Sequence, residues 1–433
     1  MNHVFVVDTK HRPLSLCHPA RARAMLKAGE AAVLRRFPFT IILMKDYGAT
    51  ELTLEASVKE MTVKIDPGSK TTGLALVDKG GRVLFAAELT HRGQAIKASL
   101  ESRRALRRGR RNRKTRYRMA RFDNRRRPDG WLPPSLNHRV QTTMTWIERF
   151  RRLCGITETA VERVKFDMQL MRNPEISGVE YQQGTLAGYS IREYLLEKFN
   201  RTCVYCDKQD VPLQVEHVLA KANGGGNAVS NLALSCEPCN TKKGTQRVED
   251  FLNKKPEALA KLQRQLKSSL KDAAAVNATR NAIFTALLKT GLPVEVGTGA
   301  QTKFNRTRLG YGKAHWIDAA CVGESGASVT LDPAMQPLLI RAAGQGNRQM
   351  CGTDPYGFPI RHRRRQKAHF GYETGDLVSA EVPSGKKAGV HQGRVLCRAT
   401  GSFDIQTKAG RVAGISHKHF IAIQRKDGYA YTS

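Results

Sequence analysis

The stretch VKIDPGSKTTGLALV, residues 63–77, decides how the centre of the chain is interpreted. It reads as an apolar strand that ends in an acid, a Pro-Gly turn and a second strand. With the third apolar run, GRVLFAAEL, residues 61–90 predict an antiparallel meander. Asp66 lies where the first strand meets the turn, and an Asp in that position is most often a turn former. A metal-binding role for Asp66 therefore requires partners from elsewhere in the chain.

Three later residues are candidate partners for Asp66. Glu162 lies in a predicted strand, and His315 and Asp318 lie on one face of a predicted helix. An antiparallel meander followed by a parallel strand and a helix is the RNase H-like layout, in which such acids meet beside the first strand. Phosphodiester hydrolysis by two Mg²⁺ ions about 4 Å apart uses acids from separate elements. Each residue alone also fits an exposed or locally paired side chain, but together they predict a split metal site.

Two CxxC pairs supply a second candidate metal site. Cys203, Cys206, Cys236 and Cys239 can give four thiolates to one tetrahedral Zn²⁺. Such paired cysteines in a chain without a disulfide pattern are typical of a reducing compartment. Most four-cysteine zinc sites are structural, so the cysteines alone say nothing about catalysis.

The residues between and beside the CxxC pairs resemble the HNH endonuclease motif, a β-hairpin and a helix around one divalent metal. Glu216 and His217 end a short strand, Asn231 precedes an apolar stretch, and Asn240 follows the last cysteine. His217 suits a general base on water, and Glu216 and Asn240 offer oxygen ligands to Mg²⁺. The resemblance implies that Asn231 pins the loop through backbone hydrogen bonds. The family's third His is Asn240 here. A zinc knuckle that only binds nucleic acid is the alternative.

The charge predicts a polyanionic partner. Lys and Arg number 72 against 38 Asp and Glu, which gives a net charge of +34 and a pI near 10.2. Nucleic acid is the expected partner, although charge alone also fits an anionic membrane surface. Residues 101–127 carry thirteen Arg and one Lys against two acids and predict a long helix that contacts phosphates, rather than a solvated tail. The candidate nucleic-acid contacts are Arg103, Arg104, Arg107, Arg108, Arg110, Arg111, Arg113, Lys114, Arg116 and Arg118.

The remaining segments have weaker signals. Residues 1–57 predict a small α+β module, residues 246–289 a helical stretch, and residues 291–310 a strand and loop. Short strands with Gly turns beyond about residue 350 predict a small β-barrel. The sequence has no apolar run of about 18 residues and no signal-peptide pattern, so a cytoplasmic protein without a membrane partner is expected.

Taken together, these motifs resemble the IscB family of transposon-encoded, RNA-guided nucleases. IDPGSKTTGLA resembles the first RuvC segment, the Arg-rich run the bridge helix, VERVKFD the second RuvC segment and HWID the third. The two CxxC pairs with VEH and SNL resemble the HNH insert. The first 57 residues resemble the PLMP domain, but Pro13-Leu14-Ser15-Leu16 replaces the motif that gives that domain its name. The last part of the chain resembles the region that contacts the guide and reads the target-adjacent motif.

The resemblance implies a multidomain α+β and α/β fold with an RNase H-like (RuvC) core split into three segments and an inserted ββα-metal HNH domain. The implied domains are a PLMP-like domain (1–57), RuvC-like segment I (58–95), the bridge helix (96–130), segment II (131–190), the HNH domain (191–252), segment III (253–345) and a guide-RNA and target-adjacent-motif domain (346–433).

The function implied is RNA-guided cleavage of double-stranded DNA. An omega RNA directs target pairing, the HNH site cuts the guide-paired strand, and the RuvC-like site cuts the displaced strand. Two Mg²⁺ ions are expected at Asp66, Glu162 and Asp318, and one at Glu216 and Asn240, beside a structural Zn²⁺. The expected state is a monomer in a prokaryotic ribonucleoprotein that associates with the nucleoid. Two alternatives stay open at this point: a guide-independent HNH endonuclease with a non-catalytic RNase H-like scaffold, and a non-catalytic nucleic-acid-binding protein.

Overall fold

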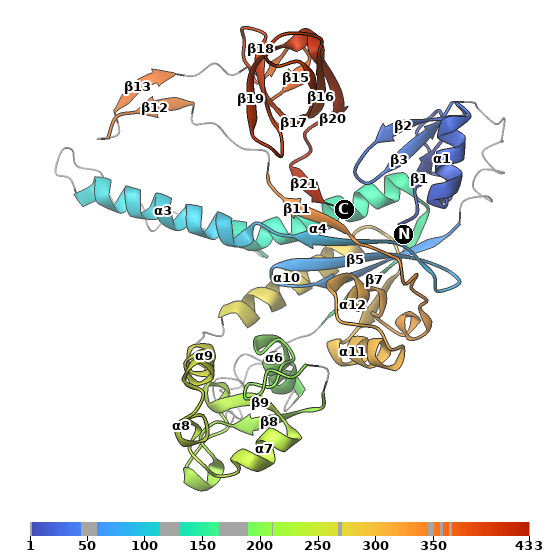
Figure 1. Cartoon of the computed structure of the whole chain (residues 1–433). Helices are drawn as coiled ribbons and strands as arrows, with labels where there is room; N and C mark the ends of the chain where they lie inside the picture. Colours follow the sequence, from blue (N-terminus) through green and yellow to red (C-terminus); the bar gives the residue numbers. More distant parts are fainter. Residues whose placement is uncertain are drawn as a thin grey trace.

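The computed structural model describes residues 2–44, 59–112, 128, 130–163, 189–209, 211–266, 271–344, 350–355, 358–362 and 366–432. It is a multidomain protein of mixed α/β structure in which separate lobes surround a central sheet (Figure 1). No helix in these ranges is long and apolar enough to traverse a lipid bilayer.

The central sheet has the strand order β10-β7-β4-β5-β6-β11-β21. Its strands are β4 (Met61–Pro67), β5 (Thr71–Asp78), β6 (Val83–Thr90), β7 (Ile156–Glu162), β10 (Val294–Gly297), β11 (Leu338–Ala342) and β21 (Tyr429–Thr432). β4, β5 and β6 form the predicted antiparallel meander, whereas β7 runs parallel to β4 and β10 runs parallel to β7. The near-continuous burial of β4 and β5 is typical of strands that are covered on both faces.

Helices cover both faces of this sheet. α4 (Pro134–Leu153) and α10 (Lys271–Leu288) pack on one face, and the short helix α12 (His315–Ala320) packs on the other. The alternation within β5 follows from the strand period of two, because Leu74 and Leu76 join the core under α4 while Ala75 and Val77 join the core under α12. Lys64 and Asp66 on β4 therefore share the face that α12 covers, since Val63 and Ile65 belong to the opposite core.

The N-terminal module is the small α+β unit predicted from the sequence. It contains β1 (Phe5–Val7), α1 (Pro19–Lys27), β2 (Ala31–Arg35) and β3 (Thr40–Leu43), and its sheet has the order β1-β3-β2. Phe5 reaches out of this module and packs with Phe85 and Phe150 in the core of the central sheet.

The module between β7 and β10 contains a β-hairpin with a core of its own. Its elements are α6 (Tyr189–Lys198), β8 (Leu213–His217), β9 (Leu232–Cys236), α7 (Glu237–Lys243), α8 (Val248–Phe251) and α9 (Pro256–Leu266). The hairpin core takes in Leu262 of α9 and Val276 of α10. The packing therefore extends beyond residue 252, where the sequence predicted the module to end.

One predicted element is described only in part, and another differs from the one observed. The Arg-rich helix α3 (Gly93–Asn112) is present, while residues 113–127 lie outside the described residues. Residues 291–310 were expected to be strand and loop, but β10 is followed there by helix α11 (Gly299–Arg308). The side chain of Thr298 caps α11 by accepting from the Gln301 amide. The buried face of α11 includes Thr302, Asn305 and Arg306, so no apolar periodicity marked it as a helix.

The last part of the chain forms a separate lobe and then returns to the central sheet (Figure 1). The lobe contains an antiparallel sheet in the order β19-β18-β17-β16-β20 with a core around Val378 and Phe403. Closure of this sheet into a small β-barrel stays a prediction. The elements are β12 (Cys351–Thr353), β13 (Pro359–His362), β14 (Ala368–His369), β15 (Tyr372–Glu373), β16 (Leu377–Val382), β17 (Gly389–Leu396), β18 (Ser402–Gln406), β19 (Arg411–Ser416) and β20 (Phe420–Gln424). β21 pairs with β11, so residues 429–432 belong to the central sheet although residues 346–433 were expected to form one domain.

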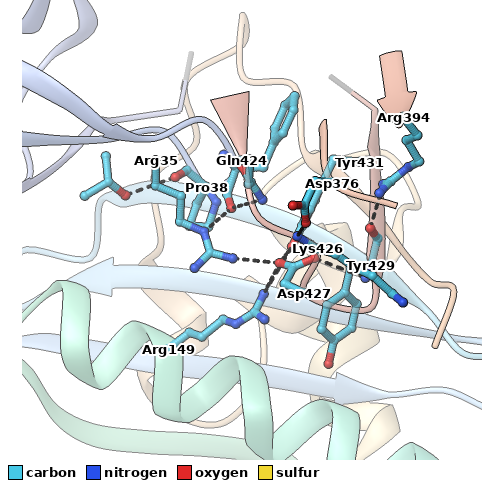
Figure 2. Close-up of polar contacts among 12 residues, drawn as sticks. Arg35, Pro38, Arg149, Asp376, Arg394, Gln424, Lys426, Asp427, Tyr429 and Tyr431 are labelled. Atoms are coloured by element: carbon cyan, nitrogen blue, oxygen red, sulfur yellow. Dashed lines mark hydrogen bonds and ion pairs between the residues drawn. The ribbon is translucent and has the colours of Figure 1, made fainter. Parts of the chain in front are cut away.

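A polar junction fixes the root of this lobe (Figure 2). Asp427 Oδ2 lies 2.6 Å from Arg35 Nη2 of the N-terminal module and 3.0 Å from Arg149 Nη1 of α4. The Tyr431 hydroxyl donates to the same carboxylate. Gln424 Oε1 accepts the Phe37 amide at 2.9 Å. Residues from three parts of the chain thus converge on one acid.

Replacing Asp427 with Asn should loosen this junction. The change keeps the size of the side chain but leaves two partly buried guanidinium groups without their anion. We expect the free energy of unfolding to fall by about 1–3 kcal/mol, the range for hydrogen bonds to charged groups. Chemical denaturation measures this, with Glu381→Gln on an exposed position of β16 as the matched control. Equal stability of the two variants would contradict the prediction.

Candidate functional site

The acids on β4 and β7 meet at the carboxyl ends of these strands. Ile65 pairs with Val161 in the parallel ladder, so the next residues, Asp66 and Glu162, lie side by side. Both residues are buried, with 8% and 5% of their surface exposed. Sequence positions almost a hundred residues apart are therefore neighbours at one edge of the sheet, as the split-site interpretation requires.

Helix α12 brings His315 and Asp318 to the same edge. His315 Nδ1 lies 3.5 Å from Asp66 Oδ2, and the hydrogen bond to Asp66 raises the pKa of His315. The close approach depends on Gly73, which pairs with Asp66 in the sheet. A Cβ atom at Gly73 would lie only 1.8 Å from the carbonyl oxygen of His315, so no other residue fits without moving α12.

Asp318 lies in a strongly perturbed environment. Burial and the negative charge of Asp66 raise the pKa of Asp318 to about 6, although Arg306 opposes this shift. Arg306 Nε lies 2.9 Å from Asp318 Oδ1, and only 3% of the Arg306 side chain is exposed. A buried carboxylate whose pKa is raised by a neighbouring acid is suited to a nearby cation, because a bound cation relieves the repulsion. Among the described residues, the only group of three or more His, Cys, Asp or Glu residues whose ligand atoms all lie within 4.8 Å of one another is the four cysteines described below, so a magnesium site at Asp66, Glu162 and Asp318 stays a prediction.

The cations around this edge were not predicted from the sequence. Besides Arg306, Arg280 of α10 contacts Glu162, with Nη2 2.9 Å from Oε1. Lys64 is buried on β4 and donates to the Val322 carbonyl at 2.9 Å and to Ser325 Oγ at 2.6 Å, which fixes the segment after α12. Burial lowers the pKa of Lys64 to about 8. The one available signal was that Lys64 stands in an otherwise apolar strand.

The four cysteines of the inserted module form a compact cluster. The sulfur atoms of Cys203, Cys206, Cys236 and Cys239 all lie within 4.8 Å of one another. A tetrahedral zinc with bonds of about 2.3 Å places its sulfur ligands about 3.8 Å apart, and Cys206 Sγ lies 3.7 Å from Cys236 Sγ. The cluster therefore fits the structural Zn²⁺ expected from the sequence.

The hairpin next to the cluster carries Glu216 and His217 at the end of β8. Glu216 is buried and its Oε1 lies 2.7 Å from Nζ of Lys243, whose side chain is 0% exposed. Lys243 also donates to the His217 carbonyl at 3.1 Å. His217 Nε2 lies 2.9 Å from Asn227 Oδ1, which orients the ring. Lys243 was not among the candidate residues predicted from the sequence.

Asn231 holds the loop that follows His217. Its side chain accepts from the Leu219 amide at 2.8 Å and donates to the carbonyl oxygens of Leu219 and Gly226 at 3.0 and 2.9 Å. Gly225 lies against this loop, because a Cβ there would come within 1.8 Å of the Leu219 carbonyl oxygen. These bonds tie the two sides of the loop together.

Asn240 has a different neighbour from the one expected. Its side-chain amide donates to Gln214 Oε1 at 2.7 Å, while Lys243, one helical turn further along α7, contacts Glu216. Gln214 and Glu216 lie two residues apart on the same side of β8. A role for Asn240 as a magnesium ligand beside Glu216 stays a prediction.

The basic helix α3 presents its arginines to solvent. Arg103, Arg104, Arg107, Arg108 and Arg111 are exposed. Nothing is described of the Arg110 side chain, and Arg113, Lys114, Arg116 and Arg118 lie outside the described residues. The helix projects away from the central sheet (Figure 1), so these guanidinium groups are available to a partner.

Comparison with known families matches two parts of the chain. Residues 4–184 match the RRXRR protein family, and residues 203–256 match an HNH endonuclease family. No curated protein sequence matches the chain. The second match covers the cysteine cluster, the hairpin and α7, so the inserted module is an HNH endonuclease domain.

Similar solved structures include Cas9 proteins. Streptococcus thermophilus Cas9 in complex with the GGAA PAM is 10% identical with a TM-score of 0.23 and covers 61% of this chain, and the same protein with the AGAA PAM is 12% identical with a TM-score of 0.24 and equal coverage. The Type II-C Cas9 enzyme from Actinomyces naeslundii is 16% identical with a TM-score of 0.16 and covers 42% of this chain. The chain spans 32%, 32% and 26% of these proteins. The RRXRR and HNH endonuclease matches together fit an IscB-like nuclease with an HNH domain and confirm the family resemblance seen in the sequence.

Proposed function

We propose that the chain is an RNA-guided endonuclease that cuts double-stranded DNA at two separate centres. The observation that supports this proposal is the position of Asp66, which follows the Ile65–Val161 pair beside Glu162 and is near enough to Asp318 for its charge to raise the pKa of Asp318. The HNH domain lies between the second and third of these acids in the sequence. One chain thus contains acids suited to one metal centre and a second, independent nuclease domain.

The topology of the central sheet supports an RNase H-like core. The order β6-β5-β4-β7-β10 combines an antiparallel meander with two parallel strands beside its first strand. In this proposal residues 58–95, 131–190 and 253–345 supply the three RuvC-like segments. The other proposed domains are the PLMP-like domain (1–57), the bridge helix (96–130), the HNH domain (191–252) and the guide-RNA and target-adjacent-motif domain (346–433).

At the RuvC-like centre, two Mg²⁺ ions would be held by Asp66, Glu162 and Asp318. This centre would cut the displaced strand. When bound, Mg²⁺ stabilises the negative charge that develops on the phosphate. His315 Nδ1 lies 3.5 Å from Asp66 Oδ2, so a proton held at Nδ1 points towards the Asp66 carboxylate. Burial of the acids excludes water, which strengthens each of these interactions.

At the HNH centre, His217 would act as general base and the guide-paired strand would be cut. Asn227 holds the His217 ring through Nε2, and Asn231 holds the loop beside it. Glu216 and Asn240 are the proposed ligands of one Mg²⁺ ion. The Zn²⁺ at the four cysteines would be structural, because it joins the start of α7 to the turn after α6.

The partners proposed are an omega RNA and its target duplex, bound by one copy of the chain. The arginines of α3 suit the phosphates of the guide, since a guanidinium makes forked contacts to phosphate oxygens. In RNA-guided systems of this kind the protein holds the heteroduplex by its backbone, and base pairing supplies the sequence specificity. Binding should weaken steeply with salt.

Changing the guide tests this function. The protein is expressed with its RNA, the guide segment is replaced, and plasmids carrying the old and the new target are offered with Mg²⁺. Cleavage should follow the new guide, and RNA-free protein should cut neither plasmid. Cleavage at an unchanged sequence, or by RNA-free protein, would overturn the proposal and favour the guide-independent HNH endonuclease.

One observation favours that rival. Glu162 and Asp318 are each paired with a buried arginine, which is also how a non-catalytic RNase H-like scaffold would neutralise its acids. Such a protein would still cut through the HNH domain. A non-catalytic nucleic-acid-binding protein would cut neither plasmid under any condition, so the same experiment separates all three functions.

A further inference from the structure

Arg280 joins the two strand ends that carry the RuvC-like acids. Its Nη2 lies 2.9 Å from Glu162 Oε1, and its Nε donates to the Pro67 carbonyl oxygen at 3.1 Å. Pro67 directly follows Asp66, and Glu162 is the last residue of β7. One guanidinium group therefore contacts the end of β4 and the end of β7 at the point where their acids lie side by side.

The contact comes from the opposite side of the sheet. Asp66 and His315 lie on the face covered by α12, whereas α10 packs with α4 on the other face. Arg280 reaches the strand ends from α10 and is 3% exposed. Its side chain is therefore buried and is held at two points, by Glu162 and by the Pro67 carbonyl.

Stability alone is a weak reason for this arrangement. Removing an arginine and a carboxylate from water costs several kcal/mol per ion, and their attraction often does no more than offset that cost. A planar guanidinium group that donates to two acceptors at once does, however, fix the direction of the carboxylate that it binds. Groups that orient a metal ligand in this way commonly change metal affinity or activity about 10–100-fold when they are replaced.

We propose that Arg280 is a positioning residue that sets the orientation of Glu162 relative to Asp66 and thereby the Mg²⁺ affinity of the RuvC-like centre. This inference rests on the proposed function. Arg280 touches neither the DNA nor the metal in this role, and it acts through the Glu162 carboxylate and the Pro67 carbonyl. The HNH centre lies in a different module, so its Mg²⁺ requirement is independent of Arg280.

The test measures the cutting of each strand as a function of Mg²⁺ concentration and, independently of cutting, the rise in melting temperature of the protein when Mg²⁺ is added. This rise should be smaller for Arg280→Met than for the unchanged protein. The RNA-loaded protein is used with a target duplex that carries a different label on each strand. For Arg280→Met, the Mg²⁺ concentration that gives half the maximal rate on the displaced strand should rise about 10–100-fold. The value for the guide-paired strand should stay unchanged. Arg280→Lys keeps the positive charge but loses the planar guanidinium group, so its half-maximal Mg²⁺ concentration should rise less.

Two controls make the outcome decisive. Arg264→Met removes an exposed arginine of α9 and should leave both Mg²⁺ curves unchanged. Cutting of the guide-paired strand in the same tube reports the folded, loaded and target-bound fraction, so the ratio of the two rates corrects for poor folding. An unshifted displaced-strand curve in Arg280→Met, or an equal shift on both strands, would overturn the inference.

Failure of the proposed function looks different. If Asp66→Ala leaves cutting of the displaced strand intact, the proposal of a RuvC-like centre at Asp66 is wrong. If Asp66→Ala abolishes that cut while Arg280→Met keeps the wild-type Mg²⁺ curve, the centre stands and only the positioning role of Arg280 fails.

Discussion

The Asp66→Ala variant should nick its target, cutting only the strand that is paired with the guide. Asp66 lies beside Glu162 at the strand ends and faces His315, so its loss removes a proposed metal ligand and the hydrogen-bond partner of His315. About 4 kcal/mol of transition-state stabilisation corresponds to about a 10³-fold loss of rate on the displaced strand. Denaturing gels with each strand labelled measure the two rates separately.

The His217→Ala variant should give the reciprocal nick. Loss of a general base typically costs about 10²–10⁴-fold, here on the guide-paired strand. Asp250→Ala, which removes an exposed acid of α8, is the control and should cut both strands. If either active-site variant lost both cuts at normal stability and normal target binding, the two centres would not be independent.

Replacing Cys236 with Ser should release zinc and unfold the HNH domain. Cys236 ends β9 and stands immediately before α7, so the metal ties the hairpin to the helix that carries Asn240 and Lys243. Structural zinc contributes about 10–16 kcal/mol in small zinc domains, which is more than the hairpin core can replace. We expect the zinc content to fall from one ion per chain to none, with loss of the guide-paired cut.

The displaced-strand cut separates this effect from general unfolding, because the central sheet has its own core. Cys397→Ser, outside the cluster, is the matched control and should keep the zinc. Elemental analysis measures the metal, and limited proteolysis reports the state of residues 203–243. Retention of a full equivalent of zinc by Cys236→Ser would contradict the four-thiolate site.

The elements with a local signal were predictable from the sequence. The meander at residues 61–90 follows from strands that alternate with Gly-containing turns, and the cysteine cluster follows from two CxxC pairs. Asp66 could be placed at a strand end because Pro-Gly marks the turn. These features depend on residues within a few positions of one another, which is why one sequence is enough to find them.

The cations around the acids were not predictable in this way. Arg280 is 118 residues from Glu162 and lies in a helix with several polar neighbours, so nothing local distinguishes it from a surface arginine. Lys243 looked like a surface lysine but is fully buried against Glu216. Helix α11 was missed because its buried side is polar. In each case the deciding contact is between residues that only the three-dimensional fold brings together.

The strand β21 has a consequence for the order in which the protein folds during synthesis. The central sheet spans residues 61 to 432, and β21 is its last strand to leave the ribosome. The HNH domain and the C-terminal lobe have local cores and can fold earlier, because short loops close at lower entropic cost. The sheet that carries Asp66 is therefore completed only after the zinc module and the basic helix already exist.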